Sequence, residues 1–239
     1  MSFTEDPYKD LKILISDGSG VIKTMTTKKD ADILIERNKI YNITFKDNTP
    51  PTTGTAKATI GGEEVDVKWV QLWAGGPKFA EYNVGVTNGK AESFGGYYCW
   101  GSSIDSDPEK ACYKGIGDLS GEYDTAYKLW GENWRMPTNA EYQALVDNCT
   151  WTCTEQNGVS GWLCTGNGDY SSNSIFLPIA GYANGGNVTG SGSVSYYFSS
   201  TPYDEEKACD LFLVKGFKNV SYDYRASGCS VRAVLNETK

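Results

Sequence analysis

A helix is encoded most clearly by the stretch MPTNAEYQALVDNC, residues 136–149. Thr138 and Glu141 have the spacing of a capping box, in which each side chain bonds a backbone N–H group of the other residue. Pro137 comes directly before this pair. The apolar side chains that follow recur at helical spacing and share one face: Tyr142, Leu145, Val146 and Cys149. We therefore predict a helix over residues 138–149 with this face turned towards the core.

Other elements are predicted on both sides of this helix. Residues 124–131 indicate a shorter helix, because Asp124 is a favoured N-cap and Gly131 a favoured helix stop. β-branched and aromatic runs predict strands at residues 175–180, 196–200, 211–214 and 230–234. The segments 181–192 and 215–228 are rich in Gly, Asn, Ser and Tyr, and we expect long loops there. Loops of this length often bind ligands.

The first 50 residues differ from the rest. Short β-branched runs at residues 11–15, 21–26, 33–35 and 40–45 predict a small antiparallel meander. Such a meander has too small a core to be stable alone, so it should dock on another element or belong to a larger sandwich. Turn-forming residues and two prolines at 47–54 interrupt the strands. We therefore predict a linker over residues 51–64 and a second domain over residues 65–239.

Composition excludes several classes of function. The 239-residue chain contains no histidine, so serine–histidine nucleophile systems and imidazole metal sites cannot form. Its formal net charge of -8 repels phosphate backbones, and nucleic acid is not an expected partner. No apolar run is long enough to span a bilayer, and the first residues lack the pattern of a signal peptide. Either the protein is cytosolic or its leader has been removed.

The seven cysteines bear on that choice. One interpretation is that most of them are small buried hydrophobic residues. The alternative is an oxidised, exported domain. In that case Cys153 and Cys164, which flank a turn-rich segment, are candidates for a disulfide, and Cys209 with Cys229 form a second candidate pair. Cys149 is expected to be a buried thiol, because it continues the apolar face of the helix.

Seven short motifs occur in a fixed order along the second region. They are Leu72-Trp73-Ala74, Tyr82-Asn83-Val84-Gly85, Gly95-Gly96-Tyr97-Tyr98-Cys99-Trp100-Gly101, Trp134-Arg135-Met136-Pro137-Thr138, Ile175-Phe176-Leu177-Pro178-Ile179-Ala180-Gly181-Tyr182, Tyr197-Phe198-Ser199-Ser200 and Ser230-Val231-Arg232-Ala233-Val234. As a colinear set, residues 65–235 resemble the "major paralogous" domain of bacterial surface proteins. The resemblance implies an α+β, C-type-lectin-like fold, with two helices packed on twisted antiparallel sheets. That fold is shared with formylglycine-generating enzymes and with the variable proteins of diversity-generating retroelements.

The same resemblance implies a location and partners. The N-terminal meander is similar to strands of a fimbrillin-type β-sandwich. Together these likenesses imply a cell-surface or secreted protein, anchored to the outer membrane of a Gram-negative bacterium, whose leader is absent from this chain. The expected ligand is a protein or glycan on another cell, and the protein is expected to be a monomer in solution. Pilus subunits are the alternative partners.

The motif residues themselves have structural interpretations. Trp100, Trp134, Phe176 and Phe198 are large apolar side chains that should anchor the core. Arg135 and Arg232 lie inside apolar motifs, which indicates semi-buried guanidinium groups bonded to backbone carbonyls or a carboxylate. The triplets with which C-type lectins bind calcium and sugar are missing. Turns such as 105–107 and 166–169 carry oxygen ligands but are expected to be solvated, so no metal or cofactor is predicted.

Function is therefore expected from the surface that the scaffold displays. Between residues 196 and 229, aromatic rings alternate with Ser, Asp, Asn and Lys, as in an antibody paratope. The corresponding stretch of the retroelement relatives is their diversified ligand surface. The resemblance thus implies contact positions at Tyr203, Asp204, Asp210, Lys218, Asn219, Tyr222, Asp223, Tyr224 and Ala226.

Two other functions stay open. A structural pilus subunit is the first alternative, because an incomplete N-terminal sandwich would expose edge strands that accept a strand from a neighbour. A formylglycine-type oxidase is the second, and it would need Cys209 and Cys229 as its reactive pair. Neither cysteine carries that family's local pattern. We therefore expect a binding protein and not an enzyme.

Overall fold

The computed structural model describes residues 12–16, 21–26, 51–103 and 112–237. The chain divides into two units, residues 1–49 and 50–239. In the first unit, β1 (Lys12–Ser16) and β2 (Val21–Thr26) pair in antiparallel fashion. These are the first two strands of the predicted meander. Its other two strands, at residues 33–35 and 40–45, lie outside the described residues.

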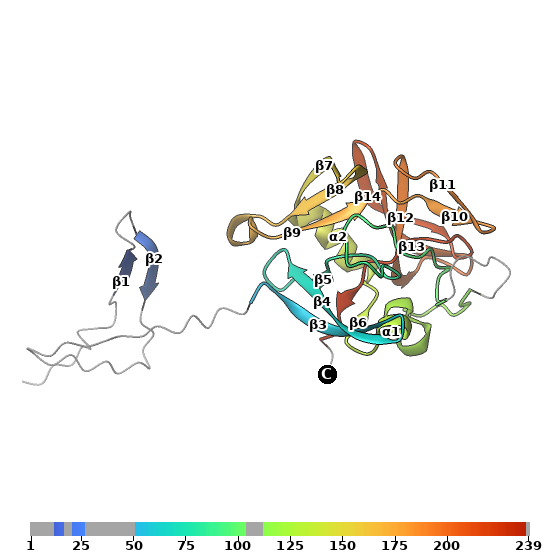
Figure 1. The fold of residues 1–239 in the computed structure, drawn as a ribbon, viewed down its shortest axis with the longest axis horizontal. Coiled ribbons are helices and arrows are strands. Elements are labelled where there is room, and N and C mark those ends of the chain that lie inside the picture. The colour runs from blue at the N-terminus through green and yellow to red at the C-terminus, as the bar shows by residue number, and fades with distance from the viewer. Residues whose placement is uncertain (1–11, 17–20, 27–50, 104–111, 238–239) are drawn as a thin grey trace, which may run out of the picture. The chain divides into compact units, whose positions relative to one another are not determined.

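The second unit is mostly β-sheet with two α-helices, a content that fits an α+β or a mainly β class (Figure 1). Its largest sheet has the strand order β3-β4-β5-β15-β6. The bounds of these strands are β3 (Thr53–Ile60), β4 (Glu63–Gln71), β5 (Lys78–Ala80), β6 (Trp134–Arg135) and β15 (Val234–Leu235). One three-stranded sheet contains β7 (Thr150–Gln156), β8 (Val159–Thr165) and β9 (Ser174–Pro178).

A second three-stranded sheet has the order β12-β13-β14. Its strands are β12 (Val194–Pro202), β13 (Lys207–Val214) and β14 (Phe217–Tyr224). A separate hairpin joins β10 (Tyr182–Asn184) to β11 (Asn187–Thr189). The helical elements are η1 (Gly121–Tyr123), α1 (Thr125–Trp130), α2 (Asn139–Asn148) and η2 (Gly168–Tyr170).

The predicted linker over residues 51–64 is wrong. Thr53–Ile60 forms β3, which pairs with β4 along its whole length. The two strands are joined by Gly61 and Gly62, both with positive φ, as a two-residue hairpin turn requires. Small residues made this strand hard to recognise, although Ala56, Ala58 and Ile60 pack on the core at every second position.

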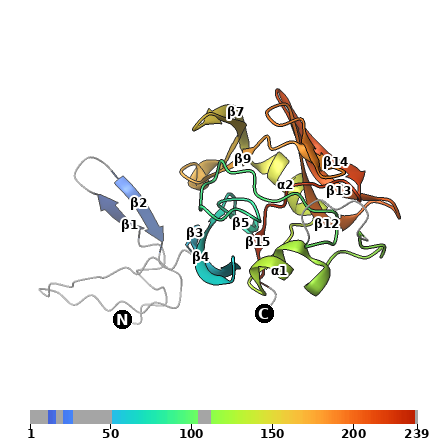
Figure 2. The same cartoon turned by 45° about the vertical axis from the view of Figure 1, so that its right-hand side comes forward.

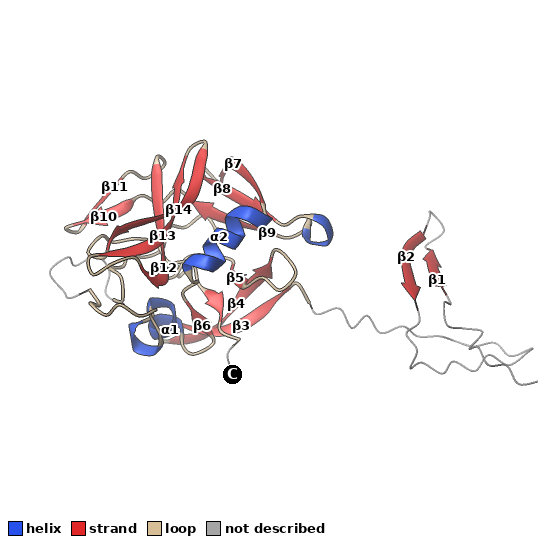
Figure 3. Ribbon diagram, turned by 180° about the vertical axis from the view of Figure 1, so that it is seen from behind, coloured by secondary structure: helices blue, strands red, loops and turns tan. Residues whose placement is uncertain are grey.

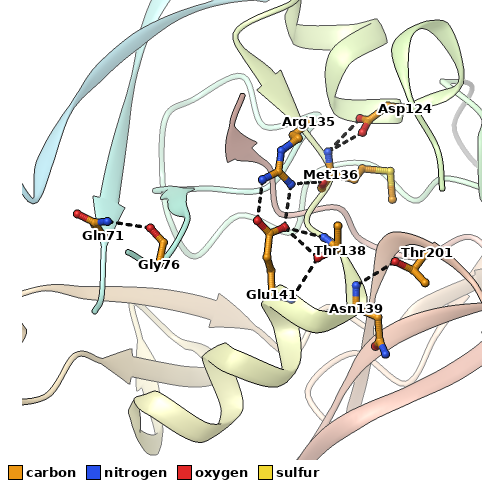
Figure 4. A network of polar contacts seen from close by, with 9 residues as sticks. All are labelled: Gln71, Gly76, Asp124, Arg135, Met136, Thr138, Asn139, Glu141 and Thr201. Atoms are coloured by element: carbon orange, nitrogen blue, oxygen red, sulfur yellow. Dashed lines mark hydrogen bonds and ion pairs between the residues drawn. The ribbon is translucent and has the colours of Figure 1, made fainter. Parts of the chain in front are cut away.

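Both predicted helices are confirmed. Asp124 caps α1 by accepting hydrogen bonds from the N–H groups of Ala126 and Tyr127. Burial raises the pKa of this carboxyl to about 6, even though it also accepts a hydrogen bond from the N–H group of Met136. At the start of α2, Thr138 and Glu141 form the predicted capping box (Figure 4).

The expected core residues are buried. Trp100, Trp134, Phe176 and Phe198 are all 3% exposed or less. Helix α2 lies between the sheet of β7–β9 and that of β12–β14 (Figures 2 and 3). Tyr142 and Leu145 of α2 pack there against Leu177 of β9 and Leu211 of β13. The helix therefore covers part of one face of the β12-β13-β14 sheet.

Both arginines predicted to be semi-buried bind as expected. The guanidinium of Arg135 donates two hydrogen bonds to the Glu141 carboxylate, at 2.6 and 2.8 Å, and one to the Met136 carbonyl (Figure 4). Arg232 is fully buried, and not semi-buried as predicted. Its guanidinium bonds three backbone carbonyls and the side-chain oxygen of Asn83. These arginines tie separate elements together.

The two predicted long loops are corrected. Residues 181–192 contain the β10–β11 hairpin, and residues 215–228 contain the eight-residue strand β14. β14 carries polar side chains on both faces, which is why its composition indicated a loop. It lies at the edge of its sheet and pairs with β13 over its full length. Of the strand predicted at residues 230–234, only Val234 lies in a strand, β15. Ser230 forms an isolated β-bridge with Tyr197.

Both predicted cysteine pairs are absent, and the strand register explains why. Asn157 and Gly158 make a two-residue turn with positive φ, so Cys153 lies opposite Trp162 and not opposite Cys164. Cys209 faces the α2 side of its sheet, opposite Tyr222, whereas Cys229 packs with Phe198 on the other side. Cys149 is buried, as predicted.

The capping box gives a first prediction. Replacing Thr138 with alanine removes the side-chain acceptor for the Glu141 N–H group and should lower the free energy of unfolding by about 1 kcal/mol. Thr138→Ser is the matched control, because serine keeps the hydroxyl and should retain most of the stability. Urea denaturation of both variants measures the difference. An equal loss in both would show that the methyl group matters and the cap does not.

Candidate ligand-binding surface

The β12-β13-β14 sheet has two different faces, and alternation along the strands assigns each side chain to one of them. Lys218, Val220, Tyr222 and Tyr224 of β14 lie on the face that α2 partly covers, since Val220 packs in the same cluster as Tyr142 of α2. The residues between them lie on the opposite face, where Phe217 contacts Phe212 of β13. The residues that we predicted to form a single ligand surface are therefore divided between the two faces of this sheet.

Three exposed tyrosines gather on the α2 face. Tyr203 and Tyr222 are stacked, with ring centroids 3.9 Å apart and an interplanar angle of 18°. The Lys207 ammonium lies 4.9 Å from the centre of the Tyr222 ring and 5.2 Å from that of Tyr224. The three rings are 54%, 44% and 55% exposed, in the order Tyr203, Tyr222, Tyr224. We call these four residues the tyrosine patch.

A hydrogen-bonded turn between β12 and β13 holds Tyr203 in place. The Tyr203 N–H group donates to the Lys207 carbonyl at 3.0 Å. The Asp204 carboxylate accepts from the N–H groups of Glu206 and Lys207, at 2.8 and 2.7 Å. Asp204 was predicted to contact ligand, but its side chain closes this turn.

Arg225 supports the same region from beneath. It is 3% exposed, and its guanidinium lies 4.3 Å from the centre of the Trp100 ring. The guanidinium donates to the carbonyls of Lys207, Asp204, Tyr113 and Gly115. Arg225 thus ties the tyrosine patch to the core. Neither this role nor that of Lys207 could be predicted from the sequence, because both depend on strand pairing.

The patch can offer ring faces, hydroxyl groups and one ammonium to a ligand. Rigid tyrosines provide a large amphipathic contact area at low entropic cost. The pKa of Tyr203 is raised above its usual value, because its negative phenolate would be repelled by that of the neighbouring Tyr222. The Tyr203 phenol therefore stays neutral at physiological pH and can both donate and accept a hydrogen bond.

Three predicted contact residues lie on the opposite face of the sheet. Asp210 is fully buried, and neither of its carboxylate oxygens has a hydrogen-bond partner in the described structure. Burial raises its pKa to about 8, and the nearby charge of Asp223 acts in the same direction. Asp223 is half-buried and binds the Tyr224 N–H group, while Asn219 is exposed. Asp210 cannot contact a ligand held by the tyrosine patch.

The last two predicted residues lie away from the stacked rings. Lys218 is on the α2 face, but its ammonium lies 5.8 Å from the rings of Trp151 and Trp162, at the other end of β14. Ala226 is exposed beyond the end of β14, and its carbonyl accepts a hydrogen bond from the Cys99 thiol. Of the nine predicted positions, Tyr203, Tyr222 and Tyr224 are the ones that the fold brings together as exposed side chains.

The described residues bear on three other predictions. No group of three acidic or cysteine side chains in residues 51–103 and 112–237 is arranged to hold a metal ion. Asn167, in the turn at 166–169, uses its amide to bind Asn148 and Thr150, and the turn at 105–107 lies outside the described residues.

Burial raises the pKa of the Cys209 and Cys229 thiols, which opposes the oxidase alternative. None of the described helices is both long and apolar enough to cross a membrane.

No family model, curated protein or solved structure matches the chain.

Proposed function

We propose that the second unit is a ligand-binding module of a bacterial cell surface, with an adhesin-like role, and that the tyrosine patch contacts the ligand. The observation that carries this proposal is the exposed Tyr203–Tyr222 stack beside Tyr224. Exposed aromatic side chains that cluster on a monomer mark interaction sites more often than scattered ones do. The expected ligand is a protein or glycan on another cell.

The finer fold and the location are part of the same proposal. Two helices packed on antiparallel sheets support a C-type-lectin-like arrangement of residues 65–239, which the motif order implied. In that arrangement the C-terminal strands carry the ligand surface, and the tyrosine patch lies on the C-terminal strands of this chain. A copy diversified by a retroelement would have a near-repeat of the codons for residues 196–234 beside a reverse transcriptase gene.

The second prediction tests the patch. Replacing Tyr203, Tyr222 and Tyr224 together with alanine should weaken binding by about 2 kcal/mol or more, roughly 30-fold in Kd, if one ring is a buried anchor in the complex. The free energy of unfolding should fall by about 1 kcal/mol or less, since the rings are exposed and lose only their stacking and their contacts with Lys207. Wild type and variant are compared on glycan and cell-surface protein arrays, with melting curves measured in parallel.

Phe217→Ala is the matched control. Phe217 is 54% exposed and belongs to the same strand, but it lies on the opposite face of the sheet. Its loss should leave binding unchanged. Weaker binding by Phe217→Ala, with normal binding by the tyrosine variant, would move the site to the opposite face and reject the tyrosine patch.

A further inference from the structure

Two pairs of cysteines meet in the folded second unit. Cys149 is the C-cap of α2 and Cys164 lies in β8, and both belong to the same buried hydrophobic cluster. Each of these two thiols shifts the pKa of the other. The Cys99 thiol likewise lowers the pKa of Cys112. Each pair joins residues more than ten positions apart in the sequence.

The backbone fixes the first pair. Cys149 directly precedes Thr150, which pairs with Thr165, and Cys164 pairs with Trp151. Cys149 is two residues before Trp151, so it lies diagonal to Cys164 on the same face of the β7–β8 ladder. Cys153, which lies opposite Trp162, is exposed and is displaced along the ladder from Cys149.

The backbone fixes the second pair as well. The Tyr113 N–H group donates to the Trp100 carbonyl at 3.0 Å. Cys112 and Cys99 are the residues directly before these two, so the hydrogen bond brings them together. Arg225 contacts both Tyr113 and Trp100, since its guanidinium donates to the Tyr113 carbonyl and lies over the Trp100 ring.

We propose that Cys149 with Cys164 and Cys99 with Cys112 are disulfide-bonded in the functional protein, which therefore passes through an oxidising compartment. In each pair two S–H bonds are lost and one S–S bond forms, with release of two protons and two electrons. The electrons reduce a disulfide oxidant, such as an oxidised dithiol protein or glutathione disulfide, to two thiols. This inference does not depend on the tyrosine patch.

Each pair contains one thiol suited to attack the oxidant first. Contact with Cys99 lowers the pKa of Cys112 to about 7, and Cys112 is partly exposed. Contact with Cys164 lowers the pKa of Cys149, whereas burial raises the pKa of Cys164 well above its usual value. The partly exposed Cys112 would form a mixed disulfide, and Cys99 would then displace the oxidant. Cys149 is buried, so its mixed disulfide would form during folding, before the core closes, and Cys164 would then displace the oxidant.

The third prediction is a disulfide map. The reduced, unfolded full-length protein is refolded with glutathione disulfide, its remaining thiols are alkylated in denaturant, and unreduced peptides are analysed by mass spectrometry. We expect two linked peptides, Cys149 with Cys164 and Cys99 with Cys112. Of the seven cysteines, Cys153, Cys209 and Cys229 should appear only in unlinked peptides, alkylated or carrying glutathione.

Two variants sharpen this test. Cys149→Ser should lose the link to Cys164 and keep the other, whereas the control Cys153→Ser should keep both. Seven alkylated cysteines after oxidation, or a link between Cys153 and Cys164, would overturn the proposal. The wild-type map decides the question even if Cys149→Ser fails to fold.

Discussion

Replacing Arg232 with leucine should lower the free energy of unfolding by about 3 to 5 kcal/mol, because the guanidinium satisfies several buried acceptors at once. It donates to the carbonyls of Ala80, Glu81 and Phe176 and to the side chain of Asn83, all within 3.1 Å. Leucine would leave these oxygens buried without a donor. It would also leave part of a fully buried site unfilled.

Arg135→Leu is the control for this prediction. Arg135 forms an ion pair with Glu141, but its side chain is 29% exposed, so water can replace the lost hydrogen bonds. We expect a loss of about 1 kcal/mol from that variant. Urea denaturation of both proteins, followed by tryptophan fluorescence, gives the two free energies. Similar small losses in both would mean that the core around Arg232 accepts an apolar side chain, as some buried charged sites do.

The helices could be predicted from the sequence because their signals are local. The capping box of Thr138 and Glu141 and the Asp124 cap are each contained within a few residues. The turn at Asn157 and Gly158 is local in the same way. β3 could be recognised only through its pairing with β4, since Gly, Ala and Lys in its sequence weaken the strand propensity of its threonines.

The ligand surface could be predicted only in part. Tyr203, Tyr222 and Tyr224 were correctly grouped because they are aromatic side chains in a polar stretch. Their stacking, and the separation of Asp210 from them, follow from the register of β12, β13 and β14. A strand that was expected to be a loop sends alternate side chains to opposite faces, so that a contiguous stretch of sequence cannot form one surface.

Asp210 is separated from the tyrosine patch, and its carboxyl is fully buried. Because ionising a buried carboxyl is unfavourable, the protein should become less stable as the pH rises. Its pKa is raised from the ordinary value of 3.8 to about 8, first by burial and then by the charge of Asp223. A raised pKa means that the folded state binds the proton more tightly than the unfolded state. The stabilisation is complete below the unfolded pKa and is lost as the pH rises through the folded pKa.

We therefore expect the wild type to lose about 4 kcal/mol of unfolding free energy between about pH 5 and about pH 8 through this one group. Asp210→Asn cannot ionise and should remove that pH dependence. The variant also buries a new amide N–H group, which changes its stability at every pH. The quantity to compare between the two proteins is therefore the slope of the unfolding free energy against pH. Asp223→Asn is the control: it removes the neighbouring charge, should lower the pKa of Asp210 and should flatten the slope only in part. Urea titrations across this pH range measure all three slopes, and parallel curves for wild type and Asp210→Asn would show that Asp210 binds no extra proton in the folded protein.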